Sequence, residues 1–143
     1  MKISRHSSVT WHGGIKDGRG AISTASGALK AYPYGFASRF EGVPGSNPEE
    51  LIAAAHASCF TMALSLLLSE AHIAITQLDT SAEVVLESVS DGFAITRIHL
   101  TLKGRVPSLD QAAFEKFATK AKLGCPVSKL LKAEITLSVE LLP

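Results

Sequence analysis

The sequence predicts a single domain that combines helices with strands, and three segments lead to this prediction. Residues 47–71 form a long apolar stretch that opens with helix-starting residues. Residues 80–106 contain two strand-like runs joined by a tight turn, and residues 135–141 alternate apolar with polar side chains, as a half-buried strand does. A chain of 143 residues is long enough to bury one core, so we expect one domain spanning residues 1–143.

The composition narrows the possible functions. Hydrophobic residues make up 46% of the chain, an ordinary share for a globular protein, and the net charge is only +1. Because no block of lysine and arginine is present to displace counterions, we expect no nucleic-acid binding. The N-terminus lacks the apolar core of a secretory signal, which predicts a cytoplasmic protein.

One apolar segment resembles a membrane span in length. Residues 51–69 carry no charge, and about twenty apolar residues suffice to cross a bilayer. The segment is nevertheless rich in alanine and serine, and it includes His56. We therefore expect a helix buried in the core or in a subunit interface, and no membrane insertion.

The first part of the chain, residues 7–40, is expected to form short strands separated by glycine-containing turns. Val9 and Trp11 alternate with polar neighbours in the first strand, and residues 19–24 form a second one. Residues 32–36 are expected to be irregular or to form an edge strand, because the proline among them cannot donate to a ladder. A loop then leads to the long helix.

The long helix has a well-marked start. Asn47 suits the N-cap, Pro48 suits the first helical position, and Glu50 falls where it can complete a capping box. This arrangement leaves Glu49 without a local capping role. The helix is expected to continue to about Ala71 and, because it is apolar nearly all round, to be enclosed on several sides.

Strands and helices alternate in the C-terminal half. Strands at residues 80–88 and 93–106 flank Asp91-Gly92, a strong hairpin signal because both residues tolerate positive φ. The final strand covers residues 135–141, where apolar and polar side chains alternate.

Two helices are expected between the hairpin and the final strand. The first begins near Ser108, with Gln111 in position for a capping box, and stops at Gly124. Pro126 then begins a short helix that ends at about Leu131.

The two cysteines are the residues best suited to chemistry, and their settings differ. Cys125 lies before Pro126 at the N-cap of the short helix, where backbone amides and the helix dipole favour an anion and lower a thiol pKa. Cys59 lies well inside the long helix, where an apolar site raises a thiol pKa. In the cytosol such a pair is either redox-active or simply two small buried apolar residues.

Cys59 becomes a nucleophile only when a cation lies close to it. His56 is one turn earlier on the same helix face, although a neutral core histidine is the commoner role. Arg39 is the other candidate, and a carboxylate such as Glu49 can bind its guanidinium through two oxygens. Since His56, Cys59 and Cys125 fall short of the four ligands of a structural zinc site, we expect no metal site.

Two segments resemble the paired cysteine motifs of the OsmC/Ohr superfamily. Residues 47–60, NPEELIAAAHASCF, resemble the first motif, and residues 124–128, GCPVS, resemble the second. Residues 38–42, 91–95 and 132–136 also resemble the osmotically inducible protein C (OsmC) branch, so the similarity extends nearly from end to end. By this resemblance the chain is identified as a member of the superfamily.

The resemblance implies an α+β, OsmC-like fold over the whole chain, with antiparallel sheets packed around a long central helix and a second helix. It implies an intertwined homodimer with active sites at the subunit interface. It also implies a cysteine-based peroxidase for oxidative and osmotic stress defence, which prefers organic hydroperoxides to hydrogen peroxide. Cys59 corresponds to the attacking thiolate and Cys125 to the resolving thiol, while Arg39 and Glu49 correspond to the family's arginine and glutamate.

The implied cycle oxidises Cys59 to a sulfenic acid, forms a disulfide with Cys125 and ends in reduction by a dihydrolipoyl-type dithiol. Apolar residues such as Phe60, Met62 and Phe36 are candidates for binding the alkyl part of the peroxide.

Alternatives to this interpretation stay open. Arg19 occupies the region from which the organic-hydroperoxide-resistance branch takes its arginine, although the match of residues 39–42 favours Arg39. The same cysteines also allow a thiol redox sensor with a protein partner, or a non-enzymatic stress or binding protein in which both thiols serve only packing.

Overall fold

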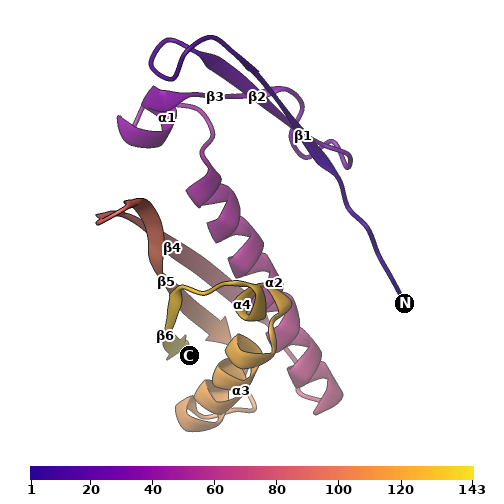
Figure 1. Cartoon of the computed structure of the whole chain (residues 1–143). Helices are drawn as coiled ribbons and strands as arrows, with labels where there is room; N and C mark the ends of the chain where they lie inside the picture. The colour runs from indigo at the N-terminus through magenta and orange to yellow at the C-terminus, as the bar shows by residue number, and fades with distance from the viewer. The chain divides into compact units, whose positions relative to one another are not determined.

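The computed structural model describes residues 1–143 and has an α+β architecture of six strands and four helices. The strands form two three-stranded sheets. The chain divides into two compact units, Met1–Leu51 and Ile52–Pro143, whose elements are labelled in Figure 1. The α+β class expected from the sequence is therefore confirmed.

The sheet of the N-terminal unit is antiparallel and has the order β1-β2-β3. Its strands are β1 (Ser7–His12), β2 (Arg19–Thr24) and β3 (Tyr32–Tyr34), close to the expected ranges. The strand β3 lies at the edge of the sheet, as predicted, where the missing amide proton of Pro33 costs the ladder little.

Two glycines, Gly18 and Gly20, make room for an aromatic pair on this sheet. The ring centroids of Trp11 and Tyr34 lie 5.5 Å apart, and Gly20 is paired with both residues in the ladder. A Cβ atom at Gly20 would collide with the Tyr34 ring, and one at Gly18 would collide with the Trp11 ring. The glycines therefore let the rings lie directly over the backbone.

The short helix α1 (Phe36–Phe40) corrects the expectation that residues 7–40 form only short strands and turns. The Ser38 hydroxyl accepts from the Gly35 amide at 3.0 Å and lies within hydrogen-bond distance of the carbonyls of Gly35 (3.1 Å) and Ser46 (2.8 Å). These bonds stabilise the helix start through local side-chain contacts, which apolar periodicity does not reveal.

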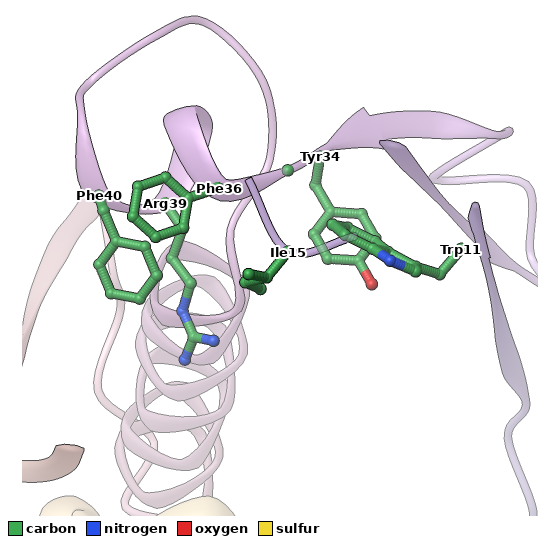
Figure 2. Close-up of a pocket in the computed structure, with 7 residues that line it drawn as sticks. Trp11, Ile15, Tyr34, Phe36, Arg39 and Phe40 are labelled. Atoms are coloured by element: carbon green, nitrogen blue, oxygen red, sulfur yellow. The ribbon is translucent and has the colours of Figure 1, made fainter. Parts of the chain in front are cut away.

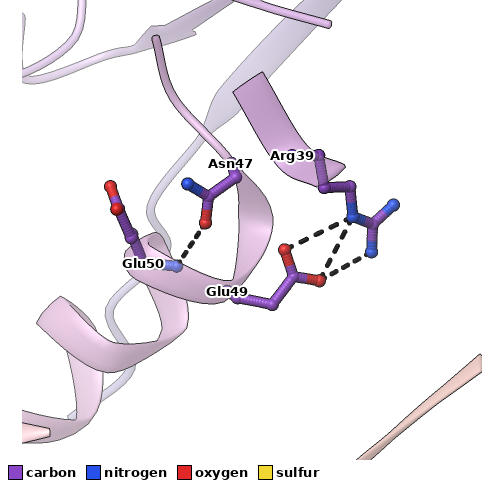
Figure 3. Close-up of polar contacts among 4 residues, drawn as sticks. All are labelled: Arg39, Asn47, Glu49 and Glu50. Carbon is purple, nitrogen blue, oxygen red and sulfur yellow. Dashed lines mark hydrogen bonds and ion pairs between the residues drawn. The ribbon is translucent and has the colours of Figure 1, made fainter. Parts of the chain in front are cut away.

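The long helix α2 (Pro48–Glu70) starts where the sequence predicts and continues from the first unit into the second. The Glu50 amide donates to Asn47 Oδ1 at 2.8 Å, which confirms Asn47 as the N-cap (Figure 3). Just beyond the last helical residue, His72 has a φ of 56°, a left-handed conformation of the kind that ends helices.

One face of α2 is buried by its own chain, and the opposite face is not. Four residues, each one turn from the next, are fully buried: His56, Phe60, Leu64 and Leu68. Met62 and Leu66 on the other face are 76% and 59% exposed, so the expected enclosure on several sides does not hold within a single chain. With a mean hydropathy of 1.9, α2 is apolar and long enough to cross a membrane, a property that core helices share.

The sheet of the C-terminal unit is mixed and has the order β4-β5-β6. The predicted hairpin is confirmed: β4 (Gln77–Val89) and β5 (Gly92–Arg105) pair antiparallel, and Gly92 has a φ of 136°. The strand β6 (Glu134–Leu141) pairs with β5 in parallel, which corrects the expectation of antiparallel sheets. A helical connection between β5 and β6 returns the chain to the end at which β5 began, and this makes parallel pairing possible.

The helix α3 (Gln111–Gly124) ends at Gly124 as predicted, but its expected start near Ser108 is wrong. Its N-cap is Asp110, whose Oδ1 accepts from the Ala113 amide at 2.8 Å. Gln111 instead binds the backbone of β6 through both ends of its side-chain amide, at 2.7 and 2.9 Å.

The core of the C-terminal unit takes residues from α2, β5 and α3. Its fully buried members are Phe60, Leu64, Leu68, Leu100, Leu102, Val106, Phe114, Ala118, Ala121 and Cys125. The short helix α4 (Pro126–Leu130) follows directly and buries none of its residues fully. The two cysteines thus border the same core, Cys125 within it and Cys59 partly buried against it.

Candidate active site

The structure brings the two cysteines together, although 66 positions separate them in the chain. Both are free thiols, and the Cys125 thiol donates to the Cys59 sulfur at an S–S distance of 2.9 Å. Cys59 is partly exposed on α2, whereas Cys125 is fully buried between α3 and α4. The pair can therefore exchange bonds with little movement, and Cys59 is the more accessible sulfur to an outside reactant.

The surroundings of Cys59 within its own unit favour the neutral thiol. Burial raises the pKa of Cys59, and its interactions with the neighbouring Cys125 sulfur raise it further. A hydrogen bond from the backbone of Val127 acts in the opposite direction. Cys59 therefore needs a nearby cation to become a nucleophile, as expected from its position inside an apolar helix.

The N-terminus of α4 was expected to stabilise a Cys125 thiolate, but its backbone amide contacts the other cysteine. Cys125 is the N-cap of α4 by its backbone position, but its side chain makes no capping hydrogen bond. The amide that reaches a sulfur belongs to Val127 in the first turn of α4, and the sulfur is that of Cys59. The sequence shows that Cys125 precedes α4. It does not show that Cys59, from another helix, lies next to the Val127 amide.

Arg39 and Glu49 form an ion pair in the N-terminal unit, between α1 and the first turn of α2 (Figure 3). Arg39 Nη2 lies 2.7 Å from Glu49 Oε1, and Arg39 Nε lies 3.2 and 3.3 Å from the two carboxylate oxygens. The Glu49 side chain is 12% exposed and that of Arg39 is 36% exposed. The guanidinium is thus fixed by a two-oxygen contact of the kind that makes such pairs strong.

Arg19, the alternative arginine, has a different setting. It is exposed at the first position of β2, opposite His12 of β1. No carboxylate lies within ion-pair distance of it, whereas Arg39 is held by Glu49.

An aromatic cavity of about 290 Å³ lies beside Arg39 in the N-terminal unit. Figure 2 shows its walls, which are formed by Trp11, Ile15, Tyr34, Gly35, Phe36, Arg39 and Phe40. The rings of Phe36 and Phe40 are 4.9 Å apart, and the Arg39 guanidinium carbon lies 5.4 Å from the centre of the Phe40 ring. An apolar chamber with a fixed cation in its wall suits a ligand with an apolar body and a polar end.

Of the three residues suggested for apolar binding, only Phe36 lines this cavity. Phe60 is fully buried in the core, and Met62 is exposed on the outer face of α2. The sequence does not identify Trp11, Ile15 and Tyr34 as site residues. Trp11 and Tyr34 lie in strands with an ordinary apolar and aromatic pattern, and Ile15 lies in the turn between β1 and β2.

His56 is fully buried on α2, and its Nε2 lies 2.7 Å from the Ser128 hydroxyl of α4. Burial lowers the pKa of His56, so the ring is neutral near pH 7. No group of three or more His, Cys, Asp and Glu side chains is positioned to hold a metal ion.

A partly exposed thiol in contact with a buried second thiol, on an α+β scaffold, is the arrangement of a two-cysteine thiol redox protein. The sequence model of the family described as OsmC-like protein matches residues 41–140. The chain belongs to this family.

Several named relatives agree with this membership. The chain is 54% identical to Peroxiredoxin OsmC of Escherichia coli (strain K12) over 141 residues, which cover 99% of each chain. It is 30% identical over 102 residues to Organic hydroperoxide resistance protein-like 2 of Staphylococcus epidermidis, with 70% of each chain covered. The crystal structure of the organic hydroperoxide resistance protein OhrB of Bacillus subtilis matches with a TM-score of 0.71 and 28% identity, covering 96% of this chain and 98% of that one.

Proposed function

We propose that this protein is a cysteine-based peroxidase that reduces organic hydroperoxides to alcohols. Hydrogen peroxide is a weaker substrate. The observation that carries the proposal is the 2.9 Å contact between the free thiols of Cys59 and Cys125. The 54% identity to a protein named as a peroxiredoxin and the similarity to organic hydroperoxide resistance proteins support the same reaction. Its proposed setting is stress defence in the cytoplasm.

In the first proposed step, the Cys59 thiolate attacks the distal oxygen of the hydroperoxide. The O–O bond breaks, the alkoxide leaves and takes up a proton to become the alcohol, and Cys59 becomes a sulfenic acid. We assign Arg39 to the stabilisation of the thiolate and of the developing negative charge, and Glu49 to holding the guanidinium in place. The ion pair at 2.7 Å supports the division of roles between Arg39 and Glu49.

In the second proposed step, Cys125 resolves the sulfenic acid. Its sulfur bonds to the Cys59 sulfur, the S–O bond of Cys59 breaks, and the hydroxyl leaves with the thiol proton as water. A dithiol of the dihydrolipoyl type then reduces the disulfide by two exchange steps and is itself oxidised to a cyclic disulfide. The proposed cycle thus needs no metal and no bound cofactor.

The aromatic cavity beside Arg39 supports a preference for organic substrates. Its walls offer Trp11, Tyr34, Phe36 and Phe40 to an alkyl or aryl group, and burying such a group adds binding energy that hydrogen peroxide lacks. We propose that the apolar part of the peroxide binds in this cavity during turnover.

We further propose that residues 1–143 act as one OsmC-like domain in an intertwined homodimer with active sites at the subunit interface. The exposure of Met62 and Leu66 on α2 supports a second copy, because a helix that is apolar on both faces favours burial on both.

Thiol counting tests the proposed reaction. With one equivalent of cumene hydroperoxide we expect rapid loss of both free thiols and the release of one equivalent of cumyl alcohol. Excess dithiothreitol should support many turnovers in the wild type and none in Cys59→Ser. Thiols that stay free in the presence of peroxide would point to a packing role for both cysteines, and a single oxidation without turnover would point to a redox sensor.

A further inference from the structure

One buried hydrogen bond joins the two elements that carry the cysteines. His56 lies one turn before Cys59 on α2, and Ser128 lies three residues after Cys125 on α4. His56 Nε2 and Ser128 Oγ are 2.7 Å apart, and His56 has no exposed surface. A contact between these side chains therefore fixes the distance between the cysteine-bearing segments.

The helix α4 has few other means of staying in place. It is five residues long, and none of its residues is fully buried. Helices this short are marginal on their own and depend on contacts with the rest of the protein. Two contacts anchor α4 toward α2. Val127 is partly buried against the core and its backbone bonds to Cys59, and a hydrogen bond joins His56 to Ser128.

The His56 ring is neutral, so His56 does not stabilise the Cys59 thiolate by its charge. Because burial lowers its pKa, the ring is neutral and supplies no positive charge to a thiolate. Its Nδ1 is buried without a hydrogen-bond partner. An unpartnered buried N–H costs more than an unpartnered lone pair, so the proton belongs on Nε2, which donates to the Ser128 oxygen.

We propose that His56 is a positioning residue for the resolving step: through Ser128 it holds α4 against α2, so that Cys125 stays in reach of Cys59 after Cys59 is oxidised. The inference rests on the proposed peroxidase function. The step concerned is the attack of the Cys125 sulfur on the sulfenic sulfur, with loss of water. When α4 moves away, the sulfenic acid persists and a second peroxide can oxidise it to a sulfinic acid.

The test separates the two chemical steps by rapid mixing with cumene hydroperoxide. The rate of Cys59 oxidation depends on peroxide concentration, whereas the rate of disulfide formation does not. For Ser128→Ala we expect an unchanged first rate and a second rate lowered roughly five- to tenfold, the fold-change that loss of one buried hydrogen bond produces. Mass spectrometry should then find more Cys59 sulfinic acid at high peroxide.

A conservative variant and a matched control sharpen this test. His56→Gln keeps a side-chain N–H near the Nε2 position and should restore most of the second rate, whereas His56→Leu should match Ser128→Ala. The control is Ser138→Ala, which removes another serine–histidine hydrogen bond, the 3.0 Å contact between Ser138 of β6 and His99 of β5. It should leave both rates unchanged.

Three outcomes decide between the possible roles. A Ser128→Ala protein that forms the disulfide at the wild-type rate overturns the inference, and so does an equal loss in both steps, which indicates a general structural effect. Thermal melting of each variant shows whether it is folded; if Ser128→Ala is not, His56→Gln against His56→Leu gives the same comparison. Wild-type thiols that fail to react with peroxide refute the proposed function itself, a result distinct from either of these.

Discussion

At the scale of single residues, the central question is how Cys59 becomes a nucleophile. Burial and the neighbouring Cys125 raise its pKa, and one backbone hydrogen bond is the opposing influence. A thiol in this condition is mostly protonated near pH 7, and only the thiolate attacks peroxide. The proposed solution is Arg39, which Glu49 holds through a two-oxygen contact.

This proposal predicts a shift in the pH dependence of Cys59 oxidation. With the cation removed in Arg39→Ala, the raised pKa is no longer offset, so the thiolate appears only at higher pH. We expect the second-order rate at pH 7 to fall roughly 100-fold, as for loss of a charge-stabilising donor, and the inflection of rate against pH to move upward. Stopped-flow oxidation between pH 5 and 10, a range that brackets the ordinary thiol pKa, measures both effects.

Two further variants complete the arginine test. Arg19→Ala should keep the wild-type pH profile, because no carboxylate holds that exposed side chain and the proposed mechanism does not use it. Glu49→Gln should lower the rate less than Arg39→Ala, since the charge stays but is no longer fixed. A wild-type profile in Arg39→Ala together with a shifted one in Arg19→Ala would transfer the role to Arg19.

At the scale of elements, the sequence was informative wherever periodicity or a local cap determines structure. The start of α2 at Asn47 and the turn before Gly92 were both predictable from the residues themselves. The helix α1 was not, because its start depends on hydrogen bonds between the Ser38 side chain and the backbone of Gly35 and Ser46, which apolar periodicity does not reveal. The parallel pairing of β6 was also missed, since the partner of a strand depends on the path of the intervening helices.

The same limit applies to the candidate site. Local pattern reasoning found both cysteines, Arg39 and Glu49, and the family resemblance supplied their expected roles. It did not find Ser128, whose partner His56 lies 72 residues earlier in the chain. Nor did it find Trp11, which matters only because it lines the cavity beside Arg39. Residue type and spacing identify groups that can react, whereas tertiary packing decides which neighbours they meet.

The N-cap of α3 can be tested by measuring how much its side chain contributes to the stability of the protein. Asp110 accepts from the Ala113 amide, whereas Ser108, the start expected from the sequence, lies outside the helix. We expect Asp110→Ala to lower the free energy of unfolding by about 1 kcal/mol, the usual cost of losing an N-cap side chain. Urea denaturation measures the change, with Ser108→Ala as the control that should stay within about 0.5 kcal/mol of the wild type. A larger loss of stability in Ser108→Ala than in Asp110→Ala would place the N-cap at Ser108.

At the scale of the whole molecule, the outer face of α2 is the feature that a single chain leaves unexplained. Met62 and Leu66 are large apolar side chains with most of their surface in solvent, one helical turn apart. A helix whose two faces are both apolar favours burial on both, and the proposed homodimer supplies the second cover.

The homodimer predicts a specific response to a charge on that face. Met62→Glu would bury an unpaired carboxylate between two copies, at a cost of several kcal/mol to association. We expect sedimentation velocity to find a wild-type dimer and a Met62→Glu monomer, with peroxidase turnover lost alongside the dimer because the active sites are proposed to lie at its interface. Leu123→Glu, at a similarly exposed leucine of α3, should remain dimeric. A monomeric wild type with full turnover would remove the interface from the mechanism and leave each chain to complete its own site.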